Sequence, residues 1–200
     1  MRLLIAHHAT WNDDPAGRLA RRVHDELRLL GHEVRALPIE RLGIALPVFP
    51  AAVADSSQRS FEQLDDTELV EYREALRQTL DVEIAAFDPQ IVHVQHAWLL
   101  AHLVLEAGVP YVASVWPDEL DSLAGDRRFR RSAVEAVENA GRLLTIDEPV
   151  RRRLQTTFPD VESERLMLLD TAADAPLVEQ LEAIYRAVLD ERFGNPTSLH

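Results

Sequence analysis

The sequence predicts one α/β domain, in which a mostly parallel, doubly wound sheet carries helices on both faces. Short apolar runs of strand length alternate along the chain with longer stretches of helical periodicity, a pattern typical of βαβ units. The clearest unit is segment 87–119, where two apolar runs flank one helix, and strands joined in this way pair in parallel with a right-handed crossover. With 200 residues and 46% hydrophobic content, the chain is large enough for one well-buried core.

The N-terminal part predicts a strand, a polar loop, a helix and a second strand. Residues 2–6 form the first apolar run. Asp14 is a suitable N-cap for a helix that begins at Pro15, where the missing N–H of proline costs no hydrogen bond. Apolar residues then repeat at helical spacing until Gly31, which favours the left-handed end of a helix. The second strand is expected over residues 33–37.

The next stretch is less regular and precedes a long helix. Residues 38–65 contain three prolines and predict no long element, apart from a short strand over residues 44–48. A helix with an apolar stripe is expected from Asp65 or Asp66, and Pro89 closes it.

The rest of the chain continues the alternation. The central unit has strands at 91–95 and 111–115, and His96 to Trp98 forms the turn into its helix. The remaining predicted elements are a polar loop over 119–125, a helix from Asp126, a strand over 142–146, a helix over 148–158, a strand over 165–169 and a helix over 176–194. We predict one domain over residues 1–200, with a core in residues 1–170 and a closing helix in residues 175–194 that packs back on it.

Composition excludes several classes of site and partner. The chain has no cysteine, which excludes disulfides and thiolate metal sites. Its net charge of −13 argues against nucleic acid, because phosphate binding needs clustered positive charge. No segment approaches the roughly 20 apolar residues of a membrane span, and the first apolar run is too short for a signal peptide, so a cytoplasmic protein is expected. The arginine runs Arg127–Arg131 and Arg151–Arg153 are either candidates for contact with anionic lipid or phosphate, or solvated helix faces.

Four loops are expected to meet where the carboxyl ends of the parallel strands open, which is where such sheets bind ligands. The loops feed helix N-termini, which attract anions, or lie close to them. They contain all three tryptophans beside histidines and carboxylates, and this combination suits a polyol or sugar. The candidate ligand-binding residues are Gly17, Trp11, His96, Trp98, Trp116, Asp118, Glu119, Asp147 and Glu148, with His7 and His8 at the end of the first strand.

The candidate catalytic residues are His96, Asp118 and Glu119, which would pair a carboxylate acid or base with an imidazole. Structural roles stay open, because the two carboxylates also suit capping and Trp98 also suits the core. A metal site from His7, His96 and Asp118 is an alternative without a spacing signature, and no metal is expected. No Walker loop and no GxGxxG motif occur, so no cofactor is expected. His93 lies within a strand and is expected to be a hydrogen-bonded core residue.

Three segments resemble the N-terminal domain of the GT-B glycosyltransferases of family 4, which are retaining enzymes that use nucleotide sugars. The first segment is MRLLIAHH, followed by a glycine at the helix start and then by GHEV. The second is FDPQIVHVQHAWLLA followed by GVPYV, and the third is AGRLLTIDEPVRRRL. In that family this Rossmann-like domain mainly holds the acceptor, and a second domain binds the nucleotide sugar. The resemblance implies that Gly17 approaches the donor phosphate and that His96 lines the cleft between the domains.

The chain departs from the family pattern where the chemistry is expected. Trp116-Pro117 stands in place of a His-Gly pair whose histidine is an active-site group, and Asp147 stands in place of a serine. Thr171-Ala172 replaces the Asn-Gly of the family's linker, and neither the donor domain nor its paired-glutamate motif is present. Residues 177–194 resemble the last helix of these enzymes, as if the chain ran from the first domain straight to that helix.

These observations lead to three hypotheses. We expect a glycosyltransferase-like, single-domain protein that binds a sugar- or nucleotide-sugar-like ligand and needs a separate protein partner, which supplies the donor domain, for glycosyl transfer. The alternative is a non-catalytic interaction or regulatory module for a full-length glycosyltransferase or a biosynthetic complex, with Trp11, Trp98 and Trp116 as interface anchors. The third is an enzyme of altered chemistry, with Asp118, Glu119 or Asp147 as acid or base and His96 as partner.

Overall fold

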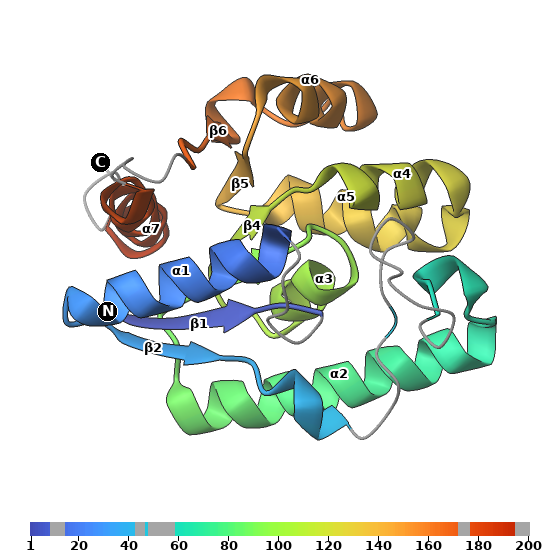
Figure 1. The fold of residues 1–200 in the computed structure, drawn as a ribbon, viewed down its shortest axis with the longest axis horizontal. Helices are drawn as coiled ribbons and strands as arrows, with labels where there is room; N and C mark the ends of the chain where they lie inside the picture. Colours follow the sequence, from blue (N-terminus) through green and yellow to red (C-terminus); the bar gives the residue numbers. More distant parts are fainter. Residues whose placement is uncertain (9–14, 43–46, 48–58, 172–176, 195–200) are drawn as a thin grey trace, which may run out of the picture.

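The computed structural model describes residues 1–8, 15–42, 47, 59–171 and 177–194, and its centre is a parallel sheet (Figure 1). Six strands pair in the order β2-β1-β3-β4-β5-β6, and every pairing is parallel. The strands are β1 (Arg2–Ala6), β2 (Glu33–Ala36), β3 (Ile91–Gln95), β4 (Tyr111–Ser114), β5 (Arg142–Thr145) and β6 (Leu166–Leu168). This arrangement confirms the predicted doubly wound α/β fold.

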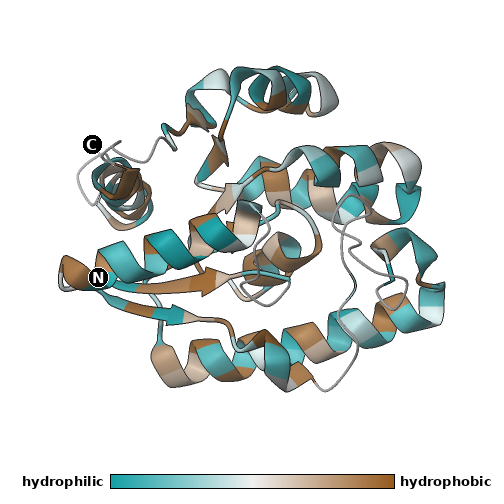
Figure 2. Ribbon diagram, in the orientation of Figure 1, coloured by the Kyte–Doolittle hydropathy of each residue, from teal (hydrophilic) through white to brown (hydrophobic). Residues whose placement is uncertain are grey.

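Helices cover both faces of the sheet and build two cores. On one face, α1 (Pro15–Leu29) and α7 (Leu177–Phe193) pack against the strands. The other core takes buried side chains from α2 (Asp66–Phe87), α3 (Leu99–Glu106), α4 (Pro117–Gly125), α5 (Arg130–Asn139) and α6 (Glu148–Thr157). Short 3-10 turns are η1 (Ile39–Leu42), η3 (Phe61–Gln63), η4 (Arg127–Phe129) and η5 (Ser163–Arg165). Figure 2 shows β1 in hydrophobic colours beside α1, along which hydrophilic and hydrophobic residues alternate. No described helix is long and apolar enough to cross a bilayer.

The helix α4 is the main difference from the predicted elements. Residues 119–125 were expected to form a polar loop, but a helix starts at Pro117, where the residue has no N–H to leave unpaired. Its N-cap is Trp116, and the Glu119 side chain reaches back to accept the Trp116 N–H at 2.7 Å. The predicted short strand over 44–48 lies outside the described residues except for Pro47, which is not in a strand.

The strand order creates a topological switch point between β1 and β3. From β1 the chain moves to β2 on one side, and after β2 it returns past β1 to β3 on the other side. Connections that leave in opposite directions open a crevice at the carboxyl ends of the strands, and open α/β sheets bind ligands there. The residues directly after β1 and β3 are therefore the first place to look for a site.

The closing helix α7 packs back on the domain as predicted. Leu181, Tyr185 and Val188 are buried in the core that α7 shares with α1. Arg142 at the start of β5 forms an ion pair with Glu191 near the end of the helix. Apolar burial thus provides most of the attachment, and the ion pair adds to it.

Gly141 lets α7 approach the start of β5, and this close contact makes a testable prediction. A Cβ atom at position 141 would lie 2.5 Å from Val188 Cγ1 and 3.2 Å from the Tyr111 carbonyl oxygen. We expect Gly141→Ala to lower the free energy of unfolding in chemical denaturation by about 1–3 kcal/mol, because overpacking forces neighbouring groups to move.

A matched substitution and a double variant test the cause. At Gly125 a Cβ atom would meet only Glu62 Oε1, at 3.8 Å, so Gly125→Ala is expected to stay within about 0.5 kcal/mol of the wild type. Val188→Ala should relieve part of the loss caused by Gly141→Ala, because it removes the clashing methyl groups. Fully additive losses in the double variant would mean that this contact is not the cause.

Candidate functional site

Three histidines meet at the carboxyl edge of the sheet between β1 and β3. His7 and His8 follow β1, His96 follows β3, and all three side chains are buried. The rings of His7 and His96 stack with centroids 5.6 Å apart and planes at 17°, and the His8 ring lies 5.8 Å from that of His96. The indole of Trp116, beyond the end of β4, lies 6.4 Å from the His96 ring. The structure thus brings these four rings to the switch point, and we call them the ring cluster.

Burial keeps two of these imidazoles neutral. The pKa of His8 is lowered to about 3, mainly by burial and also by the neighbouring His7. The pKa of His96 lies well below its usual range, again mainly because of burial, with further lowering by His7 and His8. Neutral imidazoles offer one donor and one acceptor each, and His8 Nδ1 lies 3.1 Å from the Tyr72 hydroxyl. At neutral pH His8 and His96 are therefore hydrogen-bonding groups and not cations.

His96 has a left-handed backbone. Its φ angle is 80°, which is uncommon for a residue with a side chain. The surroundings fix this conformation, because the His96 N–H donates to the Ser114 carbonyl at 2.9 Å and the Ala97 N–H donates to Glu119 Oε2 at 2.7 Å. Backbone strain that is stabilised in this way is concentrated at ligand sites and switch regions.

Glu119 joins the loop after β3 to the loop after β4. Its Oε2 accepts the Ala97 N–H and its Oε1 accepts the Trp116 N–H, both at 2.7 Å. The side chain is 1% exposed, and burial raises the pKa of its carboxyl well above the usual range, although the two backbone hydrogen bonds act in the opposite direction. Because both oxygens bind the fold, the geometry makes Glu119 a positioning residue for His96 and Trp116.

Asp118 is the more accessible carboxylate of this edge. Its side chain is 25% exposed, and its Oδ1 lies 4.0 Å from His96 Nε2. The same oxygen accepts the Glu119 N–H at 3.1 Å, and the position in the first turn of α4 favours its negative charge. Asp118 thus places a carboxylate near the neutral imidazole of His96 at the switch point, beyond hydrogen-bond distance.

Trp98 does not join this arrangement. Trp98 is fully buried, and its ring packs at 5.0 Å from that of Phe61 and at 4.0 Å from that of Phe129. Its indole is thus part of the core beside α3 and presents no surface at the edge. Trp11 lies outside the described residues.

The remaining candidate residues lie at helix starts. Gly17 is buried in the first turn of α1, which begins at the same edge as the ring cluster. Asp147 is exposed and caps α6 by accepting the Val150 N–H at 2.7 Å. Glu148 is exposed and pairs with Arg151 at 3.3 Å. Asp147 therefore caps α6, and Glu148 makes a local ion pair within the same helix.

The metal alternative finds no support in the described residues, where no group of three histidines, aspartates or glutamates could hold a metal ion. His7 and His96 stack face to face, and the Asp118 oxygen is 4.0 Å from the nearest imidazole nitrogen of His96.

A buried polar chain beneath Trp116 was not predicted. The Trp116 Nε1–H donates to Gln95 Oε1 at 3.3 Å, and Gln95 Nε2 lies 3.3 Å from His93 Nε2. Because the indole can only donate, it orients the Gln95 amide so that the NH₂ group faces His93. His93 Nε2 is then the acceptor for this NH₂ group, and it also lies 2.8 Å from Ser114 Oγ. The ring proton is therefore on Nδ1, which lies 2.7 Å from the Tyr185 hydroxyl. Burial lowers the pKa of His93 to about 3, so it is the neutral, hydrogen-bonded core residue that was expected.

Comparison with known proteins gives matches among solved structures, while no protein-family model and no curated protein sequence matches the chain. Sucrose-phosphate synthase from Thermosynechococcus elongatus is 10% identical, with a TM-score of 0.57 over 86% of this chain and 49% of its own. UDP-GlcNAc 2-epimerase from Neisseria meningitidis, bound to UDP-GlcNAc, is 12% identical, with a TM-score of 0.55 over 96% of this chain and 52% of its own. The lipopolysaccharide outer core galactosyltransferase WaaB is 11% identical, with a TM-score of 0.51 over 88% of this chain and 50% of its own.

At these identities the likeness concerns the fold. The chain has a GT-B-like, Rossmann-like fold, and it spans about half the length of the structures that it matches.

Proposed function

We propose that this chain is a glycosyltransferase-like protein that binds a sugar- or nucleotide-sugar-type ligand at the switch point between β1 and β3. The observation that carries this proposal is the ring cluster, which lies where open α/β sheets bind ligands. The fold resemblance supports it, because two of the similar structures are a sucrose-phosphate synthase and a galactosyltransferase, and a third is bound to UDP-GlcNAc.

The chemistry of the residues suits such a ligand. Neutral His96 offers a donor or an acceptor to sugar hydroxyls, and the Asp118 carboxylate accepts hydrogen bonds from them. The indole of Trp116 provides an apolar face for the CH groups of a sugar ring. The family resemblance implies that the donor phosphate approaches Gly17, which lies in the first turn of α1.

We also propose that the chain corresponds to the acceptor-side domain of family 4 and that glycosyl transfer needs a separate donor-binding unit. The resemblance of three sequence segments supports this assignment, as does the coverage of about half of each similar structure. The alternative of an interaction module is less favoured, because its proposed anchor Trp98 is 0% exposed and its ring packs in the core against Phe61 and Phe129.

Binding of nucleotide sugars tests the proposal. UDP-glucose, UDP-galactose and UDP-GlcNAc are titrated into the purified chain by isothermal calorimetry, and saturable binding of at least one is expected. His96→Gly should weaken that binding by about tenfold, because it removes one ligand hydrogen bond. Glycine accepts a φ of 80° without strain, so the left-handed backbone of the loop is expected to remain.

Two results would argue against it. His24→Gln, a substitution in α1 outside the ring cluster, should leave affinity unchanged, and equal losses in both variants would mean that the switch point is not the site. Transfer of sugar from a nucleotide sugar by the purified chain alone would refute the need for a separate donor-binding unit.

A further inference from the structure

The two arginine runs of the sequence border one pocket between α4, α5 and α6. The pocket has a volume of about 310 Å³ and is lined by Arg130 from the first run and Arg153 from the second. No histidine of the ring cluster lines it, so it is separate from the site proposed above. It lies at the lower end of the range of about 300–1,000 Å³ that is typical of small-molecule sites.

The floor of the pocket is apolar and its rim is basic. Leu120, Leu123 and Phe158 are buried side chains that line it, and such surfaces bind apolar groups by excluding water. Arg130 is exposed at the rim. Arg153 reaches across from α6 to the Asp121 carboxylate on α4 at 2.6 Å.

The charges at the rim define the ligand further. The charge of Arg153 is neutralised by Asp121. Arg130 forms no ion pair with any described residue, whereas its neighbours Arg128 and Arg131 each pair with a carboxylate. Two guanidinium groups and one carboxylate leave the rim with one net positive charge. One positive charge balances a monoanion, whereas a phosphate dianion would remain uncompensated.

We propose that this pocket binds a small amphiphilic carboxylate, namely an aryl or short acyl acid. Its apolar part lies on Phe158 and the leucines, and its carboxylate lies at the arginine rim. A guanidinium group matches a carboxylate in planar, two-point geometry, which a neutral alcohol cannot use. The pocket would thus select for charge at the rim and for apolar character at the floor.

Titration with a matched pair of probes tests the proposal. 1-Naphthoate and the neutral 1-naphthalenemethanol are titrated into the full chain, with binding followed by isothermal calorimetry. We expect saturable binding of the naphthoate and about tenfold weaker binding of the alcohol. Arg130→Gln should weaken naphthoate binding by about fivefold and leave the alcohol unaffected.

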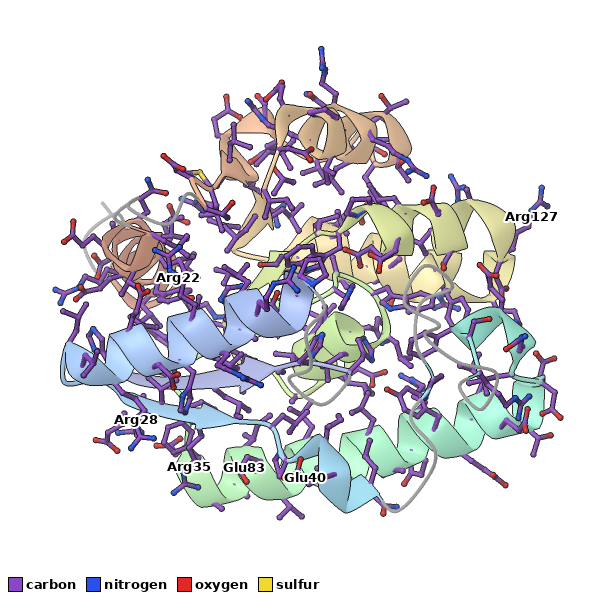
Figure 3. The ribbon with its side chains drawn as sticks, viewed as in Figure 1. Arg22, Arg28, Arg35, Glu40, Glu83 and Arg127 are labelled. Atoms are coloured by element: carbon purple, nitrogen blue, oxygen red, sulfur yellow. The ribbon has the colours of Figure 1, made fainter. Side chains whose placement is uncertain are left out.

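Two further variants make the test specific. Figure 3 shows Arg127 pointing outward at the edge of the molecule, and it does not line the pocket, so Arg127→Gln should leave naphthoate binding unchanged. Ala124 lines the pocket and is exposed, so Ala124→Phe should fill the space without disturbing the core and abolish binding of both probes.

Several results would overturn the proposal. Equal affinity for the two probes, or equal losses in Arg127→Gln and Arg130→Gln, would mean that no charge-selective pocket exists. Binding to phosphatidylglycerol vesicles that Arg127→Gln and Arg130→Gln weaken equally, without naphthoate binding, would make the arginine runs a membrane surface instead. His96→Gly is expected to leave naphthoate binding unchanged, so this result is independent of the nucleotide-sugar proposal.

Discussion

Acidification below pH 6.5 is expected to destabilise the protein steeply, with a slope of about 3 kcal/mol per pH unit near pH 5.5. Burial lowers the pKa of His8 and of His93 to about 3 and holds that of His96 well below its usual range. As the pH falls through about 6.5, the unfolded chain takes up a proton at each of these histidines and the folded protein does not. Their contribution to stability is therefore fully present above pH 6.5 and is lost below it.

Glu119 acts in the opposite direction over the same range. Burial raises the pKa of its carboxyl in the folded state, so above about pH 4.5 the folded protein retains a proton that the unfolded chain has released. On unfolding, Glu119 therefore releases up to one proton, which offsets one of the three protons that the histidines take up. A net uptake of about two protons, at about 1.4 kcal/mol per pH unit for each, accounts for the expected slope.

Urea unfolding at pH 7.5, 6.5 and 5.5 measures this slope in a range above the titration of ordinary carboxylates. His93→Gln should reduce the slope by about 1.4 kcal/mol per pH unit, because the unfolded chain then takes up one proton fewer. A wild-type slope of less than one proton would contradict the burial of neutral imidazoles.

Removal of the Glu119 carboxyl group is expected to lower the free energy of unfolding at neutral pH by about 3 kcal/mol. Glu119→Ala leaves the buried N–H groups of Ala97 and Trp116 without their acceptors, and each buried unsatisfied donor costs about 1–3 kcal/mol. Relief from burying an ionisable group offsets part of this loss. The loop of His96 should also lose its fixed position, and nucleotide-sugar binding should weaken with it.

Two further substitutions serve as comparisons for Glu119→Ala. Glu119→Gln keeps one acceptor oxygen and should lose about half as much stability. Glu148→Ala removes an exposed glutamate that also lies at a helix start and pairs only with Arg151 among the described residues, so a loss below about 1 kcal/mol is expected. If guanidinium unfolding shows the same small loss for Glu119→Ala, the two hydrogen bonds do not join the loops.

Much of the sheet could be predicted, because buried strands are continuous apolar runs between turn residues. The bounds of β1 and β3 agree with the prediction. The start of α4 was missed because its N-cap, Trp116, has no side-chain acceptor for the first N–H groups. The capping interaction comes from inside the helix, where Glu119 accepts the Trp116 N–H.

The site was predictable in its position more than in its contacts. The connection order alone places His7 and His96 at one edge, because parallel strands end on the same side. The burial of Trp98 depends on Phe61, which is far away in sequence. The bond between His93 and Tyr185 spans 92 residues, and periodicity holds no information on such pairs.

That bond gives the closing helix a second significance. If α7 opened locally, the buried Nδ1–H of His93 would lose its acceptor, at a cost of about 1–3 kcal/mol beyond the apolar surface exposed. The polar chain that begins at Tyr185 ends at Trp116, in the ring cluster. We therefore expect local opening of α7 to loosen the ligand edge as well, because one polar chain joins the two.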